Sequence, residues 1–353
     1  MRKNRESHLA SIILAAGEGT RMKSSLAKVL HQVAGLPMLA FPVRLSGKLK
    51  ADPIVVVVGK GRTRVSRVAA DHVRPGCRLL TAFQEKRLGT AHAVLQGVKL
   101  LKGFSGKVLI LYGDVPGLSL QTLKRMLSRA ERKGEPMVIL SAMMDDPFGY
   151  GRIVRDSKGE VLRIVEEKDS SRTEKRIKEV NAGIYLVDFT LLKKGLSKIG
   201  NKNVKREFYL TDLVYMAVSS GLKVGALQAG DPGEIKGVND RAQLADAIER
   251  IQNKKIESLL KSGVTLRSPG TVRLDFLVQV GRDTVIEAGA ALVGQTRIGK
   301  GCFLGHNCTI NNSYLGNDVV IGPGAVVSNS RINSGTVIRA NSVIEDRDYD
   351  KRT

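Results

Sequence analysis

Four segments of the sequence carry residues that could handle a nucleoside triphosphate. The first is a glycine-rich run, Leu14–Arg21 (LAAGEGTR), which follows an apolar stretch and ends on a cation. Glycine and small residues let a backbone approach a flat base and phosphates closely, and Arg21 can neutralise part of a triphosphate's charge. The run is not a P-loop, because no Gly-Lys-Ser/Thr sequence follows at the required spacing.

The next two segments could bring further contacts to the same ligand. Lys28 is near enough in the chain to supply a second cation to the phosphates. The amide of Gln84 could read the edge of a pyrimidine, and Gly89 with Thr90 could approach the base. Considered alone, Arg21 and Lys28 would be ordinary surface cations, and Thr90 would be a helix N-cap.

The fourth segment, Tyr112–Pro116 (YGDVP), places a carboxylate after another apolar run. A carboxylate beside a triphosphate suits Mg²⁺, which binds through one or two carboxylates together with phosphate oxygens. Taken singly, Asp114 could equally be a turn residue before Pro116.

Short apolar runs predict the strands that must hold these segments together. Compact runs bounded by Gly, Pro or charge lie at 12–15, 54–58, 78–83 and 108–112, and segments with helical spacing lie between them at 37–49, 65–71 and 90–101. This alternation predicts parallel βαβ units with helices on both faces of a sheet. Ligands of such sheets bind beyond the carboxyl ends of the strands, where the four segments lie.

The period of the sequence changes after about residue 240. A charged helix is predicted over about 240–262, and beyond it aliphatic residues recur every six positions, with two five-residue steps, which predicts a hexapeptide β-solenoid. The repeated positions are Val280, Ile286, Leu292, Ile298, Leu304, Ile310, Leu315, Ile321, Val327, Ile332, Ile338 and Ile344. We therefore predict a first domain over 1–240, a linker helix over 241–263 and a solenoid with a charged tail over 264–353.

Composition excludes some classes of protein. The chain carries a formal net charge of +23, and the first 261 residues account for +21 of it, with 47 Lys and Arg against 26 Asp and Glu. Such a field attracts polyanions, although a solvated surface explains it as well, and few aromatic residues are present to stack on bases. No run is long enough to span a membrane, and the N-terminus MRKNRESHLA is not expected to be a signal peptide. Three cysteines without close spacing favour a reducing, cytoplasmic location.

The order of these segments resembles a known enzyme family. L-A-A-G-x-G-T-R, K-V-L-H, Q-x-x-x-x-G-T-A-H-A and L-Y-G-D-V-P look like the uridylyltransferase half of bifunctional N-acetylglucosamine-1-phosphate uridylyltransferase/glucosamine-1-phosphate acetyltransferase. The similarity continues through 149–152, 164–169, 180–184, 209–212 and 237–241, and the hexapeptide solenoid also belongs to the family. It implies a Rossmann-like α/β domain with a mostly parallel mixed sheet, followed by a short left-handed parallel β-helix.

The resemblance also implies roles for individual residues. The uridine nucleotide would be lined by Leu14, Ala15, Ala16, Gly17, Lys28, Gln84, Gly89 and Thr90. Tyr112 and Gly113 would adjoin Asp114, which with Asn239 would bind Mg²⁺, and Arg21, Lys28 and Asp114 would be catalytic. The amino sugar would be held by Gly151, Glu166 and Asn181. Alternatively, Asn239 with Asp240 could cap the long helix, and Glu166 could be one carboxylate among neighbouring charges.

The implied reaction transfers a uridylyl group from UTP to N-acetylglucosamine 1-phosphate and uses Mg²⁺. The resemblance also implies a homotrimer, and no specific nucleic-acid partner is expected. A nucleotidylyltransferase for another sugar, or a non-catalytic regulatory or nucleic-acid-binding relative, is the alternative. Three departures matter: Ala27 replaces the family's usual proline and is expected to loosen the loop of Lys28, Ala182 replaces its usual threonine, and the repeat stops near Ile344. Because the family's acetyltransferase residues lie on later coils, and His306 lies too early to be one of them, we expect acetyl transfer to be absent.

Overall fold

The computed structural model describes residues 8–59 and 61–349, and it divides the chain into two compact units. The first unit comprises the chain up to His31 together with Pro37–Leu244, and the second comprises Gln32–Leu36 together with the chain from Ala245 onward. The start of the basic N-terminal segment and the end of the charged tail, both considered above, lie outside the described residues. Within the described residues, no helix is long and apolar enough to cross a lipid bilayer.

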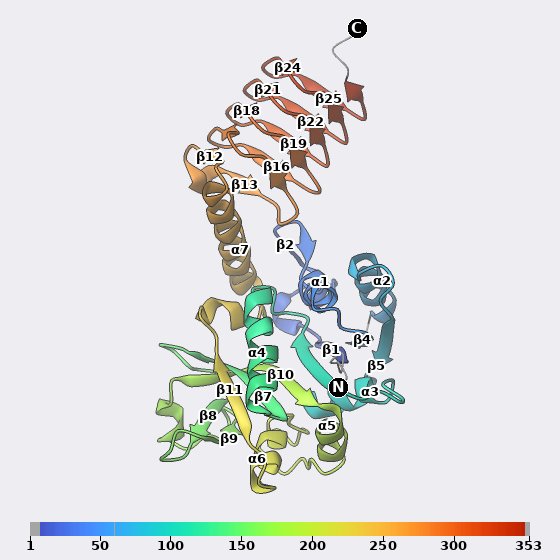
Figure 1. The fold of residues 1–353 in the computed structure, drawn as a ribbon, viewed down its shortest axis with the longest axis vertical. Helices are drawn as coiled ribbons and strands as arrows, with labels where there is room; N and C mark the ends of the chain where they lie inside the picture. The colour runs from blue at the N-terminus through green and yellow to red at the C-terminus, as the bar shows by residue number, and fades with distance from the viewer. Residues whose placement is uncertain (1–7, 60, 350–353) are drawn as a thin grey trace, which may run out of the picture. The chain divides into compact units, whose positions relative to one another are not determined.

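The first unit is built on a mixed, mostly parallel sheet with the strand order β11-β7-β10-β6-β1-β4-β5 (Figure 1). Its strands are β1 (Leu9–Ala15), β4 (Ile54–Val58), β5 (Leu79–Phe83), β6 (Lys107–Tyr112), β7 (Met137–Met143), β10 (Glu179–Asp188) and β11 (Val224–Gln228). β10 runs antiparallel to both β6 and β7, whereas β1 is parallel to β4 and β6. A short antiparallel pair, β8 (Arg152–Arg155) and β9 (Val161–Val165), joins β10.

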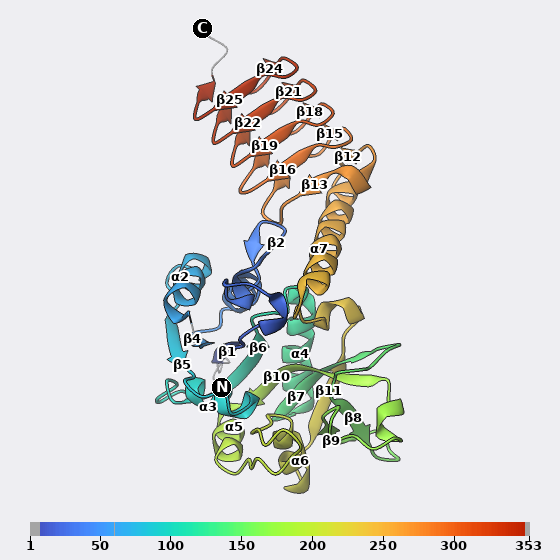
Figure 2. The same cartoon turned by 180° about the vertical axis from the view of Figure 1, so that it is seen from behind.

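Helices cover both faces of this sheet because successive strand residues point to opposite sides. In β1, Ile13 and Ala15 pack with one helix layer and Ile12 and Leu14 with the other. The first layer contains α1 (Ala40–Lys48), α2 (Arg62–His72) and α4 (Leu120–Lys133), and the second contains α3 (Thr90–Val98), α5 (Phe189–Leu196) and α6 (Asp212–Ser219). Figures 1 and 2 show the two layers from opposite sides.

The second unit is a three-sided parallel solenoid. Its faces are β12-β15-β18-β21-β24, β13-β16-β19-β22-β25 and β14-β17-β20-β23-β26, each with five strands in parallel register. The bounds are β12 (Thr265–Leu266), β13 (Arg273–Leu274), β14 (Gln279–Val280), β15 (Val285–Ile286), β16 (Ala291–Val293), β17 (Arg297–Ile298), β18 (Phe303–Leu304), β19 (Thr309–Asn311), β20 (Tyr314–Leu315), β21 (Val320–Ile321), β22 (Val326–Ser328), β23 (Arg331–Ile332), β24 (Val337–Ile338), β25 (Val343–Glu345) and β26 (Asp348–Tyr349). This is the architecture expected of a left-handed parallel β-helix.

The repeat positions predicted from the sequence point into the solenoid. All are buried except Val280, which is partly buried and packs against the same core. The predicted end near Ile344 is too early, because β26 continues the third face and pairs with β23. Each of the two five-residue steps shortens one coil to seventeen residues, as the Phe303–Val320 and Val320–Val337 pairs show. Asn312 and Asn329 lie in the shortened corners and have positive φ.

Two segments link the units along the chain. α7 (Arg241–Lys261) begins and ends one residue inside the range predicted for the charged helix. The hairpin of β2 (Gln32–Val33) and β3 (Leu36–Pro37) belongs largely to the solenoid unit, where the Phe276 N–H donates to the Ala34 carbonyl over 2.9 Å. A helix predicted from Pro37 is therefore wrong at its start, because Pro37 ends a strand and α1 begins at Ala40.

Candidate active site

The loops that carry the candidate residues start from the carboxyl ends of neighbouring parallel strands. β1 lies between β4 and β6, with Leu14 paired to Tyr112 and Ala15 paired to Val58, and Val58 is paired in turn to Phe83 at the end of β5. The segments after Ala15, Phe83 and Tyr112 therefore leave the sheet at one edge. The Gly113 N–H donates to the Leu14 carbonyl over 2.9 Å, which ties the first loop to the fourth segment.

The glycine-rich loop turns sharply after Ala16 and Gly17. Gly19 adopts a left-handed conformation, with φ at 65°, before the short 3₁₀ helix Thr20–Met22, and the Arg21 side chain is exposed to solvent. A second 3₁₀ helix starts at Lys28, after Ala27 at φ −56°. That angle lies within the range that proline imposes, so alanine keeps the backbone that the family's proline would have.

Gln84 and Gly89 lie together beside the segment around Phe208. The buried Gln84 amide donates to the Gly89 carbonyl over 3.3 Å and lies 3.1 Å from His92 Nδ1. At Gly89, where φ is 116°, an added Cβ would lie 2.5 Å from the Phe208 carbonyl oxygen, so only glycine fits. Thr90 is not the N-cap of α3, because Gly89 holds that position and the Thr90 hydroxyl accepts from the Leu210 N–H.

Asp114, Lys28 and Asn239 converge although they are far apart in the sequence. The Lys28 ammonium donates to Asp114 Oδ2 in a short ion pair and to Asn239 Oδ1 over 2.9 Å. The Val238 N–H donates to the Asp114 carbonyl, which holds the Asn239 segment against the end of β6. Asp240 caps α7 by accepting from the Gln243 N–H, so the side chain of Asn239 is left for Lys28 and does not cap the helix.

The amino-sugar candidates lie in the region of Tyr112. An added Cβ at Gly183, where φ is 76°, would lie 2.7 Å from Tyr112 Cε2, so this glycine makes room for the ring. Burial raises the pKa of Tyr112, and the nearby carboxylates of Glu166 and Asp114 raise it further. The Asn181 amide donates to the Tyr185 hydroxyl and its oxygen accepts from the Gly183 N–H.

Glu166 is the carboxylate nearest this group. Its Oε1 accepts from the Thr211 hydroxyl over 3.1 Å. Burial raises the pKa of Glu166, and the Thr211 hydrogen bond opposes part of that rise. Gly151 belongs to the same region, because its carbonyl accepts from the Asn181 N–H over 2.8 Å.

Three supporting residues received no role from the sequence. Thr211 orients Glu166, and Arg241 donates to His31 Nδ1 over 3.2 Å and to the Met22 carbonyl over 3.3 Å. These contacts anchor the start of α7 to Met22 and His31, which lie on either side of Lys28 in the sequence. Burial lowers the pKa of His31, and the Arg241 charge lowers it further, which favours the neutral ring needed to accept from Arg241 at Nδ1. The segments YLTD, KVLH and GVNDR contain all three residues, so the family motifs could have drawn attention to them.

The donor set fits Mg²⁺ in chemistry. Among the described residues, no three His, Cys, Asp or Glu side chains gather as a metal site. The carboxylate of Asp114 and the amide oxygen of Asn239 nevertheless meet at one cation, the Lys28 ammonium. Mg²⁺ accepts such a sparse set of oxygen ligands when substrate phosphates and water complete its shell.

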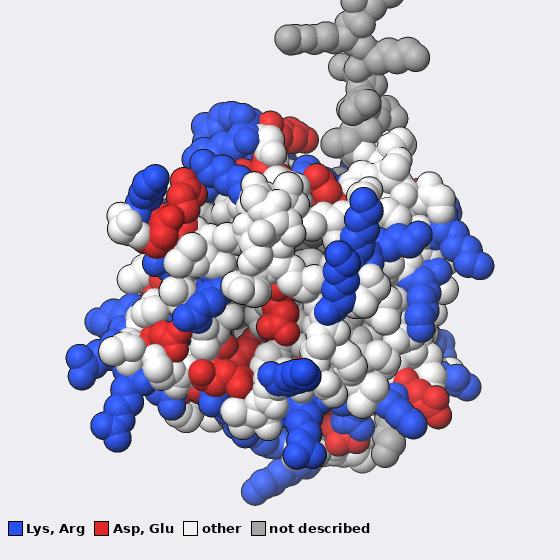
Figure 3. All heavy atoms as spheres, turned by 90° about the horizontal axis from the view of Figure 1, so that it is seen from below, with Lys and Arg blue, Asp and Glu red and all other residues white. Residues whose placement is uncertain are grey.

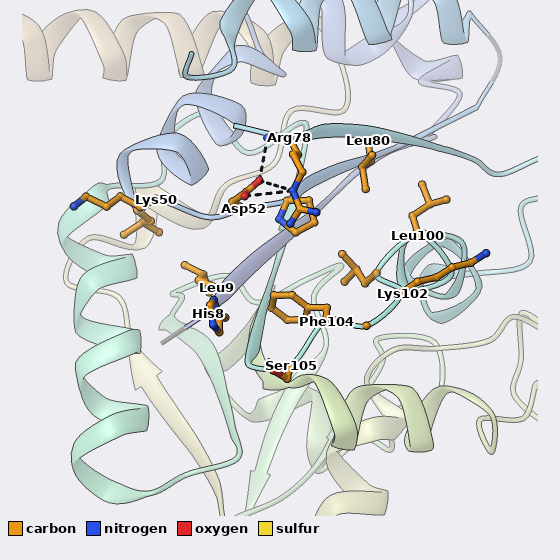
Figure 4. Close-up of a pocket in the computed structure, with 14 residues that line it drawn as sticks. His8, Leu9, Lys50, Asp52, Arg78, Leu80, Leu100, Lys102, Phe104 and Ser105 are labelled. Atoms are coloured by element: carbon orange, nitrogen blue, oxygen red, sulfur yellow. Dashed lines mark hydrogen bonds and ion pairs between the residues drawn. The ribbon is translucent and has the colours of Figure 1, made fainter. Parts of the chain in front are cut away.

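A cavity of about 780 Å³ lies elsewhere in the first unit (Figure 4). It opens near the start of β1 and β4, at the opposite end of these strands from Asp114, and its carboxylate, Asp52, pairs with Arg78. Its lining includes His8, Leu9, Lys50, Asp52, Arg78, Leu80, Leu100, Lys102 and Phe104. The candidate site residues are absent from this lining, so this cavity is separate from the candidate site.

Comparison with known proteins places both units in families. The nucleotidyl transferase family model matches residues 10–233, and the model of bacterial transferase hexapeptides (six repeats) matches residues 278–312. Because the hexapeptide region is present, the expected loss of acetyl transfer is not supported. His306 is exposed, as expected, and its Nε2 lies 3.4 Å from Glu287 Oε2.

The chain is also similar to proteins named bifunctional protein GlmU. It is 46% identical to that of Geobacter sulfurreducens over 96% of this chain and 70% of the relative. It is 46% identical to that of Trichlorobacter lovleyi over 86% of this chain and 65% of the relative. It is 44% identical to that of Caldanaerobacter subterraneus subsp. tengcongensis over 88% of this chain and 66% of the relative. The chain thus spans about two thirds of the length of these relatives. Together, the domain matches and these identities show that the chain belongs to the GlmU family of nucleotidyl transferases.

Proposed function

We propose that this protein transfers a uridylyl group from UTP to N-acetylglucosamine 1-phosphate and releases pyrophosphate. The observation that carries the proposal is the convergence of Lys28, Asp114 and Asn239 at the carboxyl edge of the sheet. Mg²⁺, held by Asp114 and Asn239 when bound, would neutralise phosphate charge. Family membership supports the nucleotidyl transfer, and the sugar and base are our inference from the site residues.

In this reaction, a phosphate oxygen of the sugar 1-phosphate attacks the α-phosphorus of UTP. A new P–O bond forms while the bond to the bridging oxygen of the β-phosphate breaks, and the pyrophosphate leaves with that oxygen. The nucleophile needs no general base, because the second pKa of a phosphate monoester is near ~6. The protein therefore acts by positioning and by neutralising charge.

Individual side chains have separate tasks in this mechanism. Arg21, which is exposed on the glycine-rich loop, would stabilise the leaving pyrophosphate, and Lys28 the attacking or transferred phosphate. Gln84 would face the base, with Leu14–Gly17, Gly89 and Thr90 around the nucleotide. Glu166 would accept hydrogen bonds from the amino sugar, and Asn181 would donate one to it. Gly151 and Tyr112 would lie beside the same sugar.

The proposal is tested by pyrophosphate release with UTP and Mg²⁺. N-acetylglucosamine 1-phosphate, glucosamine 1-phosphate and N-acetylgalactosamine 1-phosphate are compared as acceptors, and dTTP replaces UTP in a parallel series. We expect turnover with UTP and the first sugar. Turnover only with another sugar or with dTTP would redirect the substrate assignment, and folded protein with no turnover would remove the enzymatic proposal.

We also propose a homotrimer that associates through the solenoid. Val285, Phe303, Val320 and Val337 stack in register along one outer face, and the last three are at least 36% exposed. An apolar ladder of this kind suits association with other copies of the chain. The free cysteines Cys77, Cys302 and Cys308 agree with a reducing, cytoplasmic setting, which we propose for the protein.

Sedimentation at micromolar protein tests the oligomer. We expect three times the monomer mass for the wild type and a lower mass for Val320→Glu, because a charge in the ladder would lose its hydration on association. Val343→Glu places the same charge on another exposed outer position and is the matched control. A purely monomeric wild type, or equal loss of mass in both variants, would contradict an interface at this ladder.

The nucleic-acid alternative draws on the positive charge alone. On the face seen in Figure 3, Lys and Arg side chains are scattered among acidic and uncharged residues. This distribution is typical of a solvated surface and gives that alternative no specific support on this face.

A further inference from the structure

The Lys28 ammonium lies where the proposed site would hold its metal ion. Its two acceptors, Asp114 Oδ2 and Asn239 Oδ1, belong to the two residues that are proposed to hold Mg²⁺. The ion pair is largely shielded from solvent, since the Lys28 and Asp114 side chains are 10% and 17% exposed. Such a pair is stronger than a solvated surface contact, because the hydrogen bonds involve charged groups with little competing water.

The stem of Lys28 runs along the glycine-rich loop. An added Cβ at Gly19 would lie 2.5 Å from Lys28 Cβ, and one at Gly17 would lie 3.9 Å from Lys28 Cε. The ammonium therefore reaches Asp114 from beside the backbone that is proposed to cradle the phosphates. Rotation of the last side-chain torsions can carry it from the carboxylate to a phosphate without moving the backbone.

We propose that Lys28 is a displaceable internal cation that occupies the metal site until UTP binds. This inference rests on the proposed function, because it assumes that nucleotide phosphates reach the glycine-rich loop. A divalent cation cannot take the two oxygens while the ammonium holds them, since like charges at that separation repel strongly. UTP gives the ammonium new partners and frees the oxygens, so nucleotide and metal each strengthen the binding of the other.

Lys28 would thus have two partners in succession. Before binding, it neutralises Asp114 and competes with a divalent cation for the two oxygens, so that only a high concentration of the cation displaces it without substrate. After binding, it pairs with the phosphate charge, which is the role given to it in the mechanism above. The nucleotide should therefore raise the metal affinity by more than its own chelation of the metal explains. The additional increase originates in the protein and should disappear when the Lys28 charge is removed.

Mn²⁺ binding measured by electron paramagnetic resonance tests the inference without relying on activity. Lys28→Met removes the ammonium and keeps an unbranched stem as long as that of lysine, and Lys23→Met, at an exposed lysine of the same loop, is the matched control. We expect Lys28→Met to bind Mn²⁺ without nucleotide at least about tenfold more tightly than the wild type, the scale of one charged hydrogen bond. Lys23→Met should bind like the wild type, and Asp114→Asn should abolish the site in either background.

The nucleotide arm uses the α,β-methylene analogue of UTP, in which the bond to the leaving group cannot break. The analogue should raise Mn²⁺ affinity more in the wild type than in Lys28→Met, after correction for Mn²⁺ bound by the free analogue. Equal Mn²⁺ affinity in Lys28→Met and Lys23→Met would overturn the inference.

A measurement on the wild type covers the case in which Lys28→Met does not fold. Acylation of Lys28 by an amine reagent, followed by mass spectrometry, should accelerate when Mn²⁺ alone displaces the ammonium and slow again when the analogue is added. Unchanged acylation with saturating Mn²⁺ would also overturn the inference. Wild-type turnover of UTP is scored separately: turnover without displacement removes only this inference, and displacement without turnover removes only the proposed reaction.

Discussion

Asp114→Ala is expected to lower kcat for uridylyl transfer by about a thousandfold or more. Among the described residues, the Asp114 carboxylate is the charged acceptor of the Lys28 ammonium at the proposed cation site. Metal neutralisation there would supply several kcal/mol in the transition state, and roughly 4 kcal/mol corresponds to that factor. Pyrophosphate release at saturating UTP and sugar phosphate gives kcat directly. Retention of kcat within about tenfold of the wild type would show that Asp114 does not hold the metal.

The folded state should tolerate this change. Asp114 makes its ion pair through the side chain, whereas its link to Val238 uses the backbone carbonyl and remains in the variant. We expect the melting temperature to fall by about ten degrees at most, because removing one partner of a shielded ion pair costs roughly 3 kcal/mol while the Lys28 ammonium keeps Asn239 Oδ1 as an acceptor. Asp52→Ala is the matched control, because it also removes an ion-paired carboxylate, at the far end of the same sheet, and should leave kcat unchanged.

Glu166→Gln is expected to lower kcat/KM for the sugar phosphate by about a hundredfold. A partly buried carboxylate that accepts from a substrate hydroxyl discriminates strongly, because glutamine replaces one acceptor oxygen with an NH2 donor and leaves polar groups of the site and substrate unpaired. kcat/KM for UTP should change much less, since Gln84 and Gly89 belong to another part of the site. Glu160→Gln, at an exposed carboxylate paired with Lys223, is the control.

The pH dependence gives a second readout of Glu166. Its pKa is raised above the ordinary 4.5, so the carboxylate takes up a proton at a higher pH than an exposed glutamate and loses an acceptor site. kcat/KM for the sugar phosphate should therefore fall in acid through that raised pKa in the wild type. Glu166→Gln should lack this limb and keep only the titration of the substrate phosphate near ~6. An identical acid limb in both proteins would show that Glu166 does not contact the sugar.

The melting temperature of Glu166→Gln shows whether a lower activity reflects weaker sugar binding or a destabilised fold. A carboxyl with a raised pKa in the folded state binds its proton more tightly there than in the unfolded chain, so its ionisation destabilises the fold as pH rises. Glutamine removes that penalty. At neutral pH the melting temperature of Glu166→Gln should therefore equal or exceed that of the wild type.

Elements with a local signal are predictable from the sequence. β4 has the bounds 54–58 that its apolar run predicts, and the solenoid positions from Ile286 onward are buried because a six-residue spacing returns each aliphatic side chain to the same interior. Helix ends are less accurate. The apolar spacing around Pro37 predicts helix, yet Leu36 and Pro37 form the second strand of a hairpin. The Ala34 carbonyl of this hairpin accepts from the Phe276 N–H, a contact so distant in the chain that local spacing does not reveal it.

The site was predictable as a set of residues but not as an arrangement. Lys28, Asp114 and Asn239 fall in three separate segments, so only the folded chain shows that one ammonium bridges both oxygens. The alternative role of Asn239 with Asp240 as helix cap likewise could be judged only from the folded chain, in which the Asp240 side chain accepts from the Gln243 N–H. Thr211 contacts Glu166, and Arg241 contacts His31. A residue that only positions another residue has no recognisable pattern in a single sequence.

The hairpin at 32–36 bears on how such a chain could be divided or recombined. Because this short insertion belongs to the solenoid unit while its flanks belong to the sheet unit, the polypeptide passes between the two units three times. A single cut near residue 240 would therefore leave a piece of the solenoid unit behind, with the Ala34 carbonyl deprived of its partner at Phe276. Swapping solenoids between homologues would require two matched exchanges, one at the hairpin and one at α7, so the two halves are expected to be inherited together.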